Sequence, residues 1–304
     1  MARITLDDDR AKASASEAHY RRLETGDMIY FPRTPFVLTA EERAVLLASK
    51  QDGSFHKNIS YRPAEDRLRG VDPKDRAEWE RVHRAMRAYS ERAIAFMASF
   101  LPRYAQEWKI DFASFRPIEE AGRKVALRSR NDLIHIDNFP SRPSHGDRLL
   151  RIFTNINPDR PRIWVTSENF EQLAWRYAGK ARLPHPPTWI DALRSKAARL
   201  LSTLGLPVVD RPPYDQFMLR FHHYMKESEA FQRDCPKDRW EFPPDSTWIV
   251  FTDTTSHSCI SGQYALEQTF IVRRESLVSP DKAPIAILER MSGFPLGAPR
   301  SKSA

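Results

Sequence analysis

Apolar side chains recur every three or four residues in several windows of the chain, which is the pattern of amphipathic helices. Thr39, followed three residues later by Glu42, forms a capping box at the start of the first window. A longer window, 78–104, places its aromatic and aliphatic residues on one face and most of its arginines elsewhere. We therefore expect helices mainly within 39–104 and again at 188–204, where they would back a sheet.

Other segments are rich in β-branched and aromatic residues with period-two features, and Pro, Gly, Asp or Ser clusters separate them, as expected for short strands. The expected strands are 125–139, 148–156, 217–225, 246–254 and 264–274. Helices dominate early and strands late, without the βαβ alternation of a doubly wound parallel sheet. We expect an α+β fold in which helices back an antiparallel double sheet. It forms a single domain, 1–304, with a frayed tail at about 292–304.

The charge of the chain restricts its partners. The formal net charge is +8 and the pI is about 9.5. This charge favours an anionic partner such as a phosphorylated sugar, a nucleic acid or an acidic membrane surface, or else reflects a solvated basic surface. No cationic stripe is dense enough to follow a phosphate backbone, so we do not expect nucleic acid.

The sequence also indicates a compartment. No window approaches the roughly 18 apolar residues of a membrane span, and the N-terminus lacks the apolar region of a secretory signal. Cys235 and Cys259 are the two cysteines, and they lack metal-binding or redox spacing, which suits a reducing compartment. These features predict a cytoplasmic protein.

A histidine and an aspartate stand two positions apart in the apolar stretch "NDLIHIDNFPSRP". On a strand, His135 and Asp137 project from the same face, so they are two of the three ligands of a two-histidine, one-carboxylate facial triad for Fe(II). A hydrogen-bonded pair at a strand edge is the alternative. His257, which follows the apolar strand 248–251 and a polar turn, supplies a candidate third ligand.

The order of these elements resembles the 2-oxoglutarate and Fe(II)-dependent oxygenases, whose fold is a double-stranded β-helix, or jelly roll. More narrowly, "SFHKNISYRP", "LIHIDNFPSRP", "RLLRIFTNINP" and "SHSCISGQYALEQTFIV" together resemble the Kdo hydroxylases, oxygenases that hydroxylate the 3-position of 3-deoxy-D-manno-oct-2-ulosonic acid (Kdo) in the lipopolysaccharide inner core. The resemblance covers about residues 28 to 280.

This resemblance implies a chemistry and a partner. His135, Asp137 and His257 would be the iron ligands, with Fe(II) as cofactor and 2-oxoglutarate as cosubstrate with O2, releasing succinate and CO2. The substrate would be an anionic sugar lipid, Kdo-lipid A. The basic charge and the absence of a span fit peripheral contact with the inner face of the inner membrane.

The distal carboxylate of 2-oxoglutarate needs a fixed cation, for which the arginine fork is suited. Arg274 or Arg273 at the end of the last strand is one choice, with Ser276 as a second donor. Arg151 is the other, on the same strand face as Asn155. The two placements have about equal weight, and an arginine in a surface ion pair is the alternative for each.

Residues for the sugar acid are sought in two basic stretches, either of which is otherwise an ordinary basic loop. Arginine and lysine would pair with the carboxylate, and an aromatic ring would pack on the sugar. The substrate-binding candidates are Lys57, Tyr61, Arg62, Arg128 and Arg130.

Further histidines and the second cysteine are not expected to be ligands. His222 and His223 would face opposite ways on a strand, so at most one joins a site. Cys259 is expected to be a small core residue.

Two other classes of function remain open. A His, Asp, His site with an open position also suits a zinc hydrolase, which would act without oxygen or a 2-oxo acid. A non-catalytic sugar- or lipid-binding barrel would bind its ligand even without His135.

Overall fold

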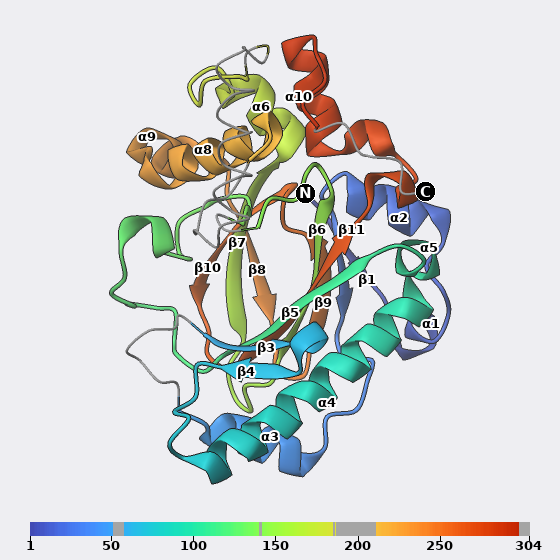
Figure 1. Ribbon diagram of the computed structural model, residues 1–304, viewed down its shortest axis with the longest axis vertical. Coiled ribbons are helices and arrows are strands. Elements are labelled where there is room, and N and C mark those ends of the chain that lie inside the picture. Colours follow the sequence, from blue (N-terminus) through green and yellow to red (C-terminus); the bar gives the residue numbers. More distant parts are fainter. Residues whose placement is uncertain (51–57, 140–141, 185, 187–210, 298–304) are drawn as a thin grey trace, which may run out of the picture.

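The computed structural model describes residues 1–50, 58–139, 142–184, 186 and 211–297, and consists of two sheets with helices around them (Figure 1). The larger sheet has the strand order β1-β2-β9-β6-β11-β5-β3-β4. Its strands are β1 (Arg3–Thr5), β2 (Met28–Phe31), β3 (Ile59–Arg62), β4 (Arg67–Arg69), β5 (Lys109–Arg116), β6 (Arg148–Asn155), β9 (Thr247–Phe251) and β11 (Ala265–Val272).

The smaller sheet has the strand order β10-β7-β8. Its strands are β7 (Arg162–Asn169), β8 (Asp238–Phe242) and β10 (Thr255–Ser261). Every pair of neighbouring strands in both sheets is antiparallel except β1 and β2, which are parallel. The prediction of an antiparallel double sheet is therefore confirmed.

Helices lie outside the double sheet and in the connection between β7 and β8 (Figure 1). They are α1 (Asp8–Ala11), α2 (Glu17–Glu24), α3 (Ala40–Ala48), α4 (Arg76–Phe100), α5 (Pro102–Ala105), α6 (Phe170–Tyr177), α8 (Pro213–Glu227), α9 (Glu229–Asp234) and α10 (Pro284–Ser292). Short 3-10 turns occur at η1 (Pro63–Glu65), η2 (Leu127–Ser129), η3 (Arg274–Ser276) and η4 (Pro280–Lys282).

The two helices predicted within 39–104 are confirmed. The hydroxyl of Thr39 accepts a hydrogen bond from the amide of Glu42 (3.2 Å), and the Glu42 carboxylate accepts one from the Thr39 amide (2.9 Å), as the capping box requires. Helix α4 ends at Phe100 because Pro102 cannot continue it. The predicted helix at 188–204 lies outside the described residues.

Side chains on opposite faces of the large sheet enter different cores, because neighbouring residues of a strand point to opposite sides. On β6, Leu150 and Ile152 join the core under the helices, whereas Phe153 joins the cluster between the sheets. The inter-sheet cluster consists of Met28, Tyr30, Phe153, Trp164, Phe242, Trp248, Val250 and Cys259. Its rings stack closely, with the Phe242 and Trp248 centroids 3.9 Å apart. Cys259 is thus the small core residue that the sequence predicts.

The predictions of two strands, at 217–225 and 125–139, are wrong. Residues 217–225 lie in helix α8 instead, since Phe217, Phe221 and Met225 follow a helical period and bury one face. Residues 125–139 contain no regular strand: the segment has one turn, η2, and a single backbone bridge between His135 and His257.

A buried ion pair fixes the turn between β9 and β10. Arg148 and Asp253 are both almost fully buried, with 2.9 Å between Nε and Oδ2. The Asp253 carboxylate also accepts a hydrogen bond from the Leu149 amide (3.3 Å), and Arg148 donates one to the Thr254 hydroxyl (2.5 Å). The pair therefore anchors the chain just before the strand that carries His257.

Replacing Asp253 with Asn should destabilise the protein by about 3–5 kcal/mol, because it leaves the Arg148 guanidinium buried without its counter-charge. Urea unfolding of the protein at pH 7 measures this loss. Glu241→Gln, which breaks the exposed Arg239–Glu241 pair, is the control and should change the unfolding free energy by less than about 1 kcal/mol. Equal effects of the two substitutions would contradict the assignment of Asp253 as an anchor.

Candidate active site

His135, Asp137 and His257 form a compact cluster of potential metal ligands. One donor atom from each side chain lies within 4.8 Å of the other two. His135 Nε2 is 3.6 Å from Asp137 Oδ1, and His257 Nε2 is 3.8 Å from Asp137 Oδ2. Both histidines are almost fully buried and the aspartate is nearly so. The structure therefore brings together the three residues that the sequence nominated.

The segment that carries His135 and Asp137 is paired with β10 on one side. The backbone amides of His135 and His257 each donate to the other's carbonyl, at 3.0 and 2.8 Å. The Asp137 amide donates to the Thr252 carbonyl at 2.7 Å. These bonds set the distance between the first two side chains of the cluster and the third.

On its other side, the segment is held by side chains of α8 and α9 rather than by a strand. The Gln232 amide group accepts from the Ile134 amide (3.0 Å) and donates to the Ile134 carbonyl (2.8 Å), as a neighbouring strand would. The His222 Nδ1–H donates to the Ile136 carbonyl (2.6 Å). Side chains of two helices thus take the place of a neighbouring strand. The backbone groups of the segment are hydrogen-bonded, but the segment is not part of a regular sheet.

Each histidine of the cluster has a fixed tautomer. His135 Nδ1 lies 2.7 Å from the Leu133 carbonyl, and His257 Nδ1 lies 2.8 Å from the Thr255 carbonyl. A carbonyl oxygen only accepts, so each Nδ1 carries the proton and each Nε2 presents a lone pair to the cluster. Burial holds the pKa of His135 well below its ordinary value and also lowers that of His257. Both rings are neutral at pH 7, which is the form that binds metal.

Asp137 is held as a carboxylate. Burial alone would raise its pKa, but the Arg151 guanidinium opposes that shift, and the pKa lies well below the usual range. Arg151 Nη1 is 2.9 Å from Asp137 Oδ2 and 3.2 Å from a Glu267 oxygen. Even so, Oδ2 is a buried oxygen without a well-directed hydrogen bond in the described part of the chain. A cation between the three side chains would satisfy it.

The cluster opens into a small cavity of about 40 Å³. Its lining residues are Arg116, Asn131, His135, Asp137, Arg151, Phe153, Arg162, Trp164, His257 and Cys259. The Trp164 ring stacks on the His257 ring, with 4.9 Å between centroids. Within the described residues, Arg116 Nε, Arg162 Nε and Trp164 Nε1 are buried donors without a hydrogen-bond acceptor. A wall with several unsatisfied donors suits an anionic ligand.

Arg162 and Gly262 are packed together at this cavity. Arg162 Nη1 donates to the Gly262 carbonyl at 3.0 Å, and a Cβ on Gly262 would lie 2.7 Å from Arg162 Cγ. The glycine also has φ +130°, which disfavours other residues. Sequence reasoning missed Arg116, Arg162 and Trp164; the signal was period-two alternation in "RPRIWVTS", which places Arg162 and Trp164 on one face of β7.

Most of the residues predicted to bind 2-oxoglutarate are elsewhere. Arg151 lines the cavity, but Asn155 ends β6 and its side-chain amide bonds backbone groups of residues 157, 160 and 242. Arg273 and Arg274 follow β11 and lie near Glu107, Glu275 and Glu289 at 3.6–4.0 Å. Ser276 belongs to the same turn, η3, outside the cavity lining. The structure therefore does not bring Arg273, Arg274, Ser276 and Asn155 to the lining of this cavity.

The substrate candidates are also dispersed. Arg62 lies on the face of β3 opposite that of Tyr61, which is buried and donates to Asp66 at 2.8 Å. Arg128 and Arg130 are engaged at the surface. Their partners are Glu227 and Asp132, each at 2.5 Å. Lys57 lies outside the described residues. None of the described substrate candidates lines the cavity beside His135.

His222 borders the cluster, and it lies on helix α8 rather than on the strand that the sequence predicted. Its ring centroid is 5.1 Å from that of His135, and it points its Nδ1–H at the backbone. Burial lowers its pKa to about 4, so the ring is neutral. His223 is the next residue of α8, and its ring centroid is 5.8 Å from that of His222. As predicted, neither belongs to the ligand cluster.

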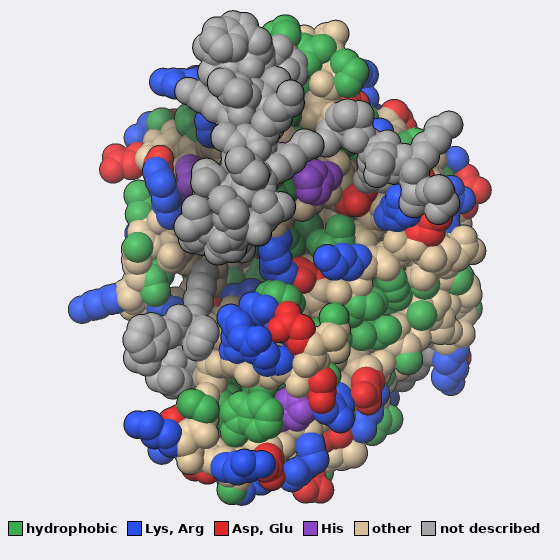
Figure 2. Space-filling model, viewed as in Figure 1, with side chains coloured by type: hydrophobic (Ala, Val, Ile, Leu, Met, Phe, Trp, Pro, Cys, Tyr) green, Lys and Arg blue, Asp and Glu red, His purple; other side chains and the backbone are tan. Residues whose placement is uncertain are grey.

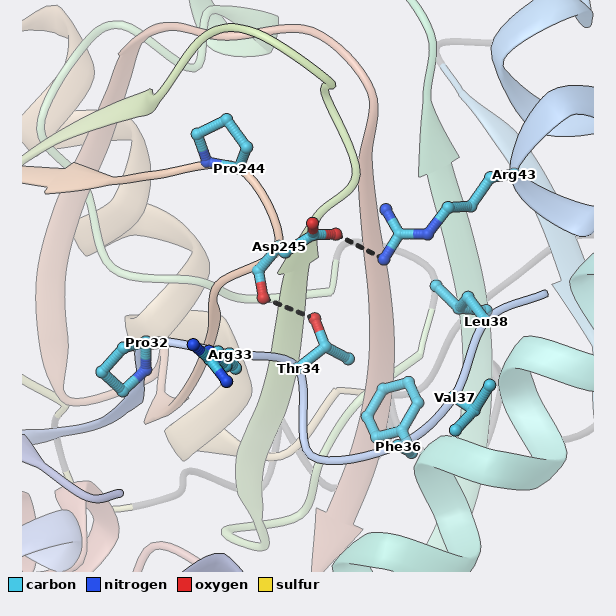
Figure 3. Close-up of a pocket in the computed structure, with 9 residues that line it drawn as sticks. All are labelled: Pro32, Arg33, Thr34, Phe36, Val37, Leu38, Arg43, Pro244 and Asp245. Carbon is cyan, nitrogen blue, oxygen red and sulfur yellow. Dashed lines mark hydrogen bonds and ion pairs between the residues drawn. The ribbon is translucent and has the colours of Figure 1, made fainter. Parts of the chain in front are cut away.

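A second pocket lies on the surface, at the loop after β2 (Figure 3). Its lining residues are Pro32, Arg33, Thr34, Phe36, Val37, Leu38, Arg43, Pro244 and Asp245. Arg43 pairs with Asp245, whose carbonyl accepts from Thr34 at 2.7 Å (Figure 3). The pocket shares no residue with the cavity beside His135 and lacks a ligand cluster among the described residues.

Comparison with known proteins agrees with this geometry. A model of the 3-deoxy-D-manno-oct-2-ulosonic acid (Kdo) hydroxylase family matches residues 7–295. No curated protein sequence matches the chain. A solved structure of the Kdo hydroxylase KdoO, a non-haem Fe(II) 2-oxoglutarate-dependent dioxygenase in complex with 2-oxoglutarate and Fe(III), is 32% identical over 100% of both chains, with a TM-score of 0.84. The apo structure of KdoO is also 32% identical over 100% of both chains, with a TM-score of 0.85.

A KdoO complex with succinate and Fe(III) is similar to the same degree, with 32% identity, 99% of both chains covered and a TM-score of 0.84. The protein therefore has the fold predicted from the sequence, an antiparallel double-stranded β-helix with N-terminal and inserted helices. The chain belongs to the Kdo hydroxylase family.

Replacing Gln232 with Leu should weaken Fe(II) binding about 10- to 100-fold, because the segment carrying His135 and Asp137 loses the side chain that holds its outer edge. Anaerobic titration of the metal against the apo protein measures the affinity. Gln216→Leu, at an exposed position of α8, is the matched control. Unchanged affinity in Gln232→Leu would show that pairing with β10 and the His222 hydrogen bond orient the ligands without Gln232.

Proposed function

We propose that His135, Asp137 and His257 hold the Fe(II) of this enzyme and that it hydroxylates the 3-position of a Kdo sugar in the lipopolysaccharide inner core. The chain is a 2-oxoglutarate-dependent dioxygenase, as its membership of the family and the KdoO structures indicate. The observation that carries the ligand assignment is the buried cluster of two neutral imidazoles and one ionised carboxylate.

The residues fit the metal. Three protein donors on one side of a cavity leave coordination positions free, as in the facial triad of non-haem iron oxygenases. When bound, Fe(II) supplies the activation of O2, coupled to oxidative decarboxylation of 2-oxoglutarate to succinate and CO2 and to hydroxylation of the substrate. The Leu133 and Thr255 carbonyls orient the two imidazoles for this metal.

Arg162, Arg116 and Trp164 are the residues we propose for the 2-oxoglutarate carboxylate that is not beside the metal. All three line the cavity and have unsatisfied buried N–H groups. Arg151 has a different role, since its guanidinium lies between Asp137 and Glu267 and keeps the Asp137 carboxylate ionised. Fe(II) carries two positive charges and 2-oxoglutarate two negative ones, so binding both leaves the net charge of this buried region unchanged.

The chain's residues also protect the site. Phe153 and Trp164 line the cavity together with the ligands, and the inter-sheet cluster closes the space behind them. Water is thereby kept from one side of the reaction centre. Substrate must enter from the side that this cluster leaves open.

Kdo-lipid A is the proposed acceptor, met at the inner face of the inner membrane. The net charge of +8 supports contact with an anionic lipid surface. Among the helices of the described residues, none is long and apolar enough to cross a membrane. Peripheral contact from the cytoplasm is therefore the mode of approach that we propose.

Anaerobic addition of Fe(II) and 2-oxoglutarate should produce a weak visible charge-transfer band in the wild-type protein and none in His135→Ala, because the variant lacks one of three ligands. The product is then identified by adding Kdo-lipid A and oxygen and measuring a mass increase of one oxygen atom.

Zinc-supported hydrolysis without a 2-oxo acid would instead favour the zinc hydrolase. Ligand binding by His135→Ala, without a charge-transfer band in the wild type, would favour the non-catalytic barrel.

Replacing Arg162 with Gln should raise the dissociation constant for 2-oxoglutarate at least about tenfold, because a buried charge-assisted contact is lost. Metal binding without 2-oxoglutarate should stay within about twofold, since Arg162 is not among the metal ligands. The charge-transfer band, titrated with 2-oxoglutarate, measures the constant. Arg274→Gln is the control at the position that the sequence suggested; a larger effect there would contradict the assignment.

A further inference from the structure

The inner face of the large sheet continues past the metal cluster onto β5 and β3. On β5, Phe112 and Arg116 point to the same side, and Arg116 lines the cavity. The pairing of Ser60 with Ser114 places Arg62 beside Phe112 on that side. In the view of Figure 2, Lys and Arg side chains gather near the middle of the molecular surface, over β3 and β4.

Arginine and phenylalanine side chains alternate from this face to the metal ligands. The guanidinium carbon of Arg62 is 4.5 Å from the Phe112 ring centroid, and that of Arg142 is 3.9 Å from the same centroid. Arg142 is also 4.4 Å from the Phe139 centroid, and Arg151 is 5.3 Å from it. We name these five residues the arginine–phenylalanine stack.

Each arginine of the stack has a carboxylate neighbour, and Arg151 has two, Asp137 and Glu267. Arg142 pairs with Asp111, and Arg62 Nη1 is 3.1 Å from the half-exposed Glu65. Burial lowers the pKa of Arg142, Asp111 opposes that shift, and Arg151 and Arg62 add to it by repulsion. Arg62 Nε is a buried donor without an acceptor in the described part of the chain. An oxyanion beside Arg62 would accept from this donor and would offset the repulsion among the neighbouring guanidinium ions.

We propose that Arg62 and Arg142, held by Phe112, bind the oxyanion group of the acceptor, and that the stack sets the distance from that group to the metal. This proposal rests on the proposed function. Arg151 ends the stack 2.9 Å from Asp137, so the bound anion is connected to the reaction centre through two aromatic rings. A sugar-acid carboxylate and a lipid phosphate share the required chemistry.

The test is direct binding of Kdo-lipid A, free Kdo and inorganic phosphate to the anaerobic Fe(II)·2-oxoglutarate complex, followed by calorimetry. Arg62→Gln and Arg142→Gln should each raise the dissociation constant for Kdo-lipid A about tenfold or more. The charge-transfer band and the affinity for 2-oxoglutarate should not change. Arg81→Gln, at an exposed position of α4, removes the same charge elsewhere and should bind Kdo-lipid A as the wild type does.

The outcomes separate the source of the anion. Weaker binding of free Kdo, with phosphate binding unchanged, assigns the site to the sugar carboxylate; weaker binding of Kdo-lipid A and phosphate, with free Kdo unchanged, assigns it to a lipid phosphate. Dissociation constants of both variants within about twofold of the wild type would overturn the proposal. If the wild-type protein gives no charge-transfer band, the proposed function fails separately from this proposal. Binding of the acceptor to the apo protein then still tests the arginine–phenylalanine stack.

Discussion

The reciprocal backbone bonds between His135 and His257 are the interaction on which the site depends. They join a segment before β6 to strand β10, and so bring ligands 122 positions apart in the sequence (257 − 135) to the same edge of the double sheet. The inter-sheet cluster and the Arg148–Asp253 pair fix β10, while Gln232 and His222 fix the other segment. The site is therefore held from both sides before a metal binds.

Charge is the second constraint on the site. Arg151 lies between Asp137 and Glu267, Arg116 between Glu267 and Glu120, and the sequence of contacts continues to Arg162. Burial is unfavourable for each of these ions alone, so opposite charges alternate through the region. This alternation keeps the Asp137 carboxylate ionised, and it leaves unsatisfied guanidinium donors on Arg116 and Arg162, two residues that line the cavity. The same arrangement thus prepares the site for a metal and for a dianion.

Sequence reasoning identified His135, Asp137 and His257 because the motif, its spacing and the surrounding stretches resemble one family. It failed where local pattern and tertiary context disagree. Residues 217–225 contain enough aromatic side chains to suggest a strand, but their helical period buries them in α8. Arg273 and Arg274 follow β11 in the sequence, but they lie near Glu107, Glu275 and Glu289 and do not line the cavity. Their position at the end of a strand did not reveal this.

The sequence by itself determined the antiparallel class of the fold, the capped helix at Thr39, the long helix α4 and the candidate metal ligands, since these depend on local periodicity or on motifs of particular residues. Tertiary structure alone decided that Arg116, Arg162 and Trp164 meet at the cavity, and that helix side chains replace a strand beside His135. Those contacts join residues far apart along the chain. Which residues meet therefore depends on how the two sheets face each other. The periodicity within one segment does not specify that arrangement.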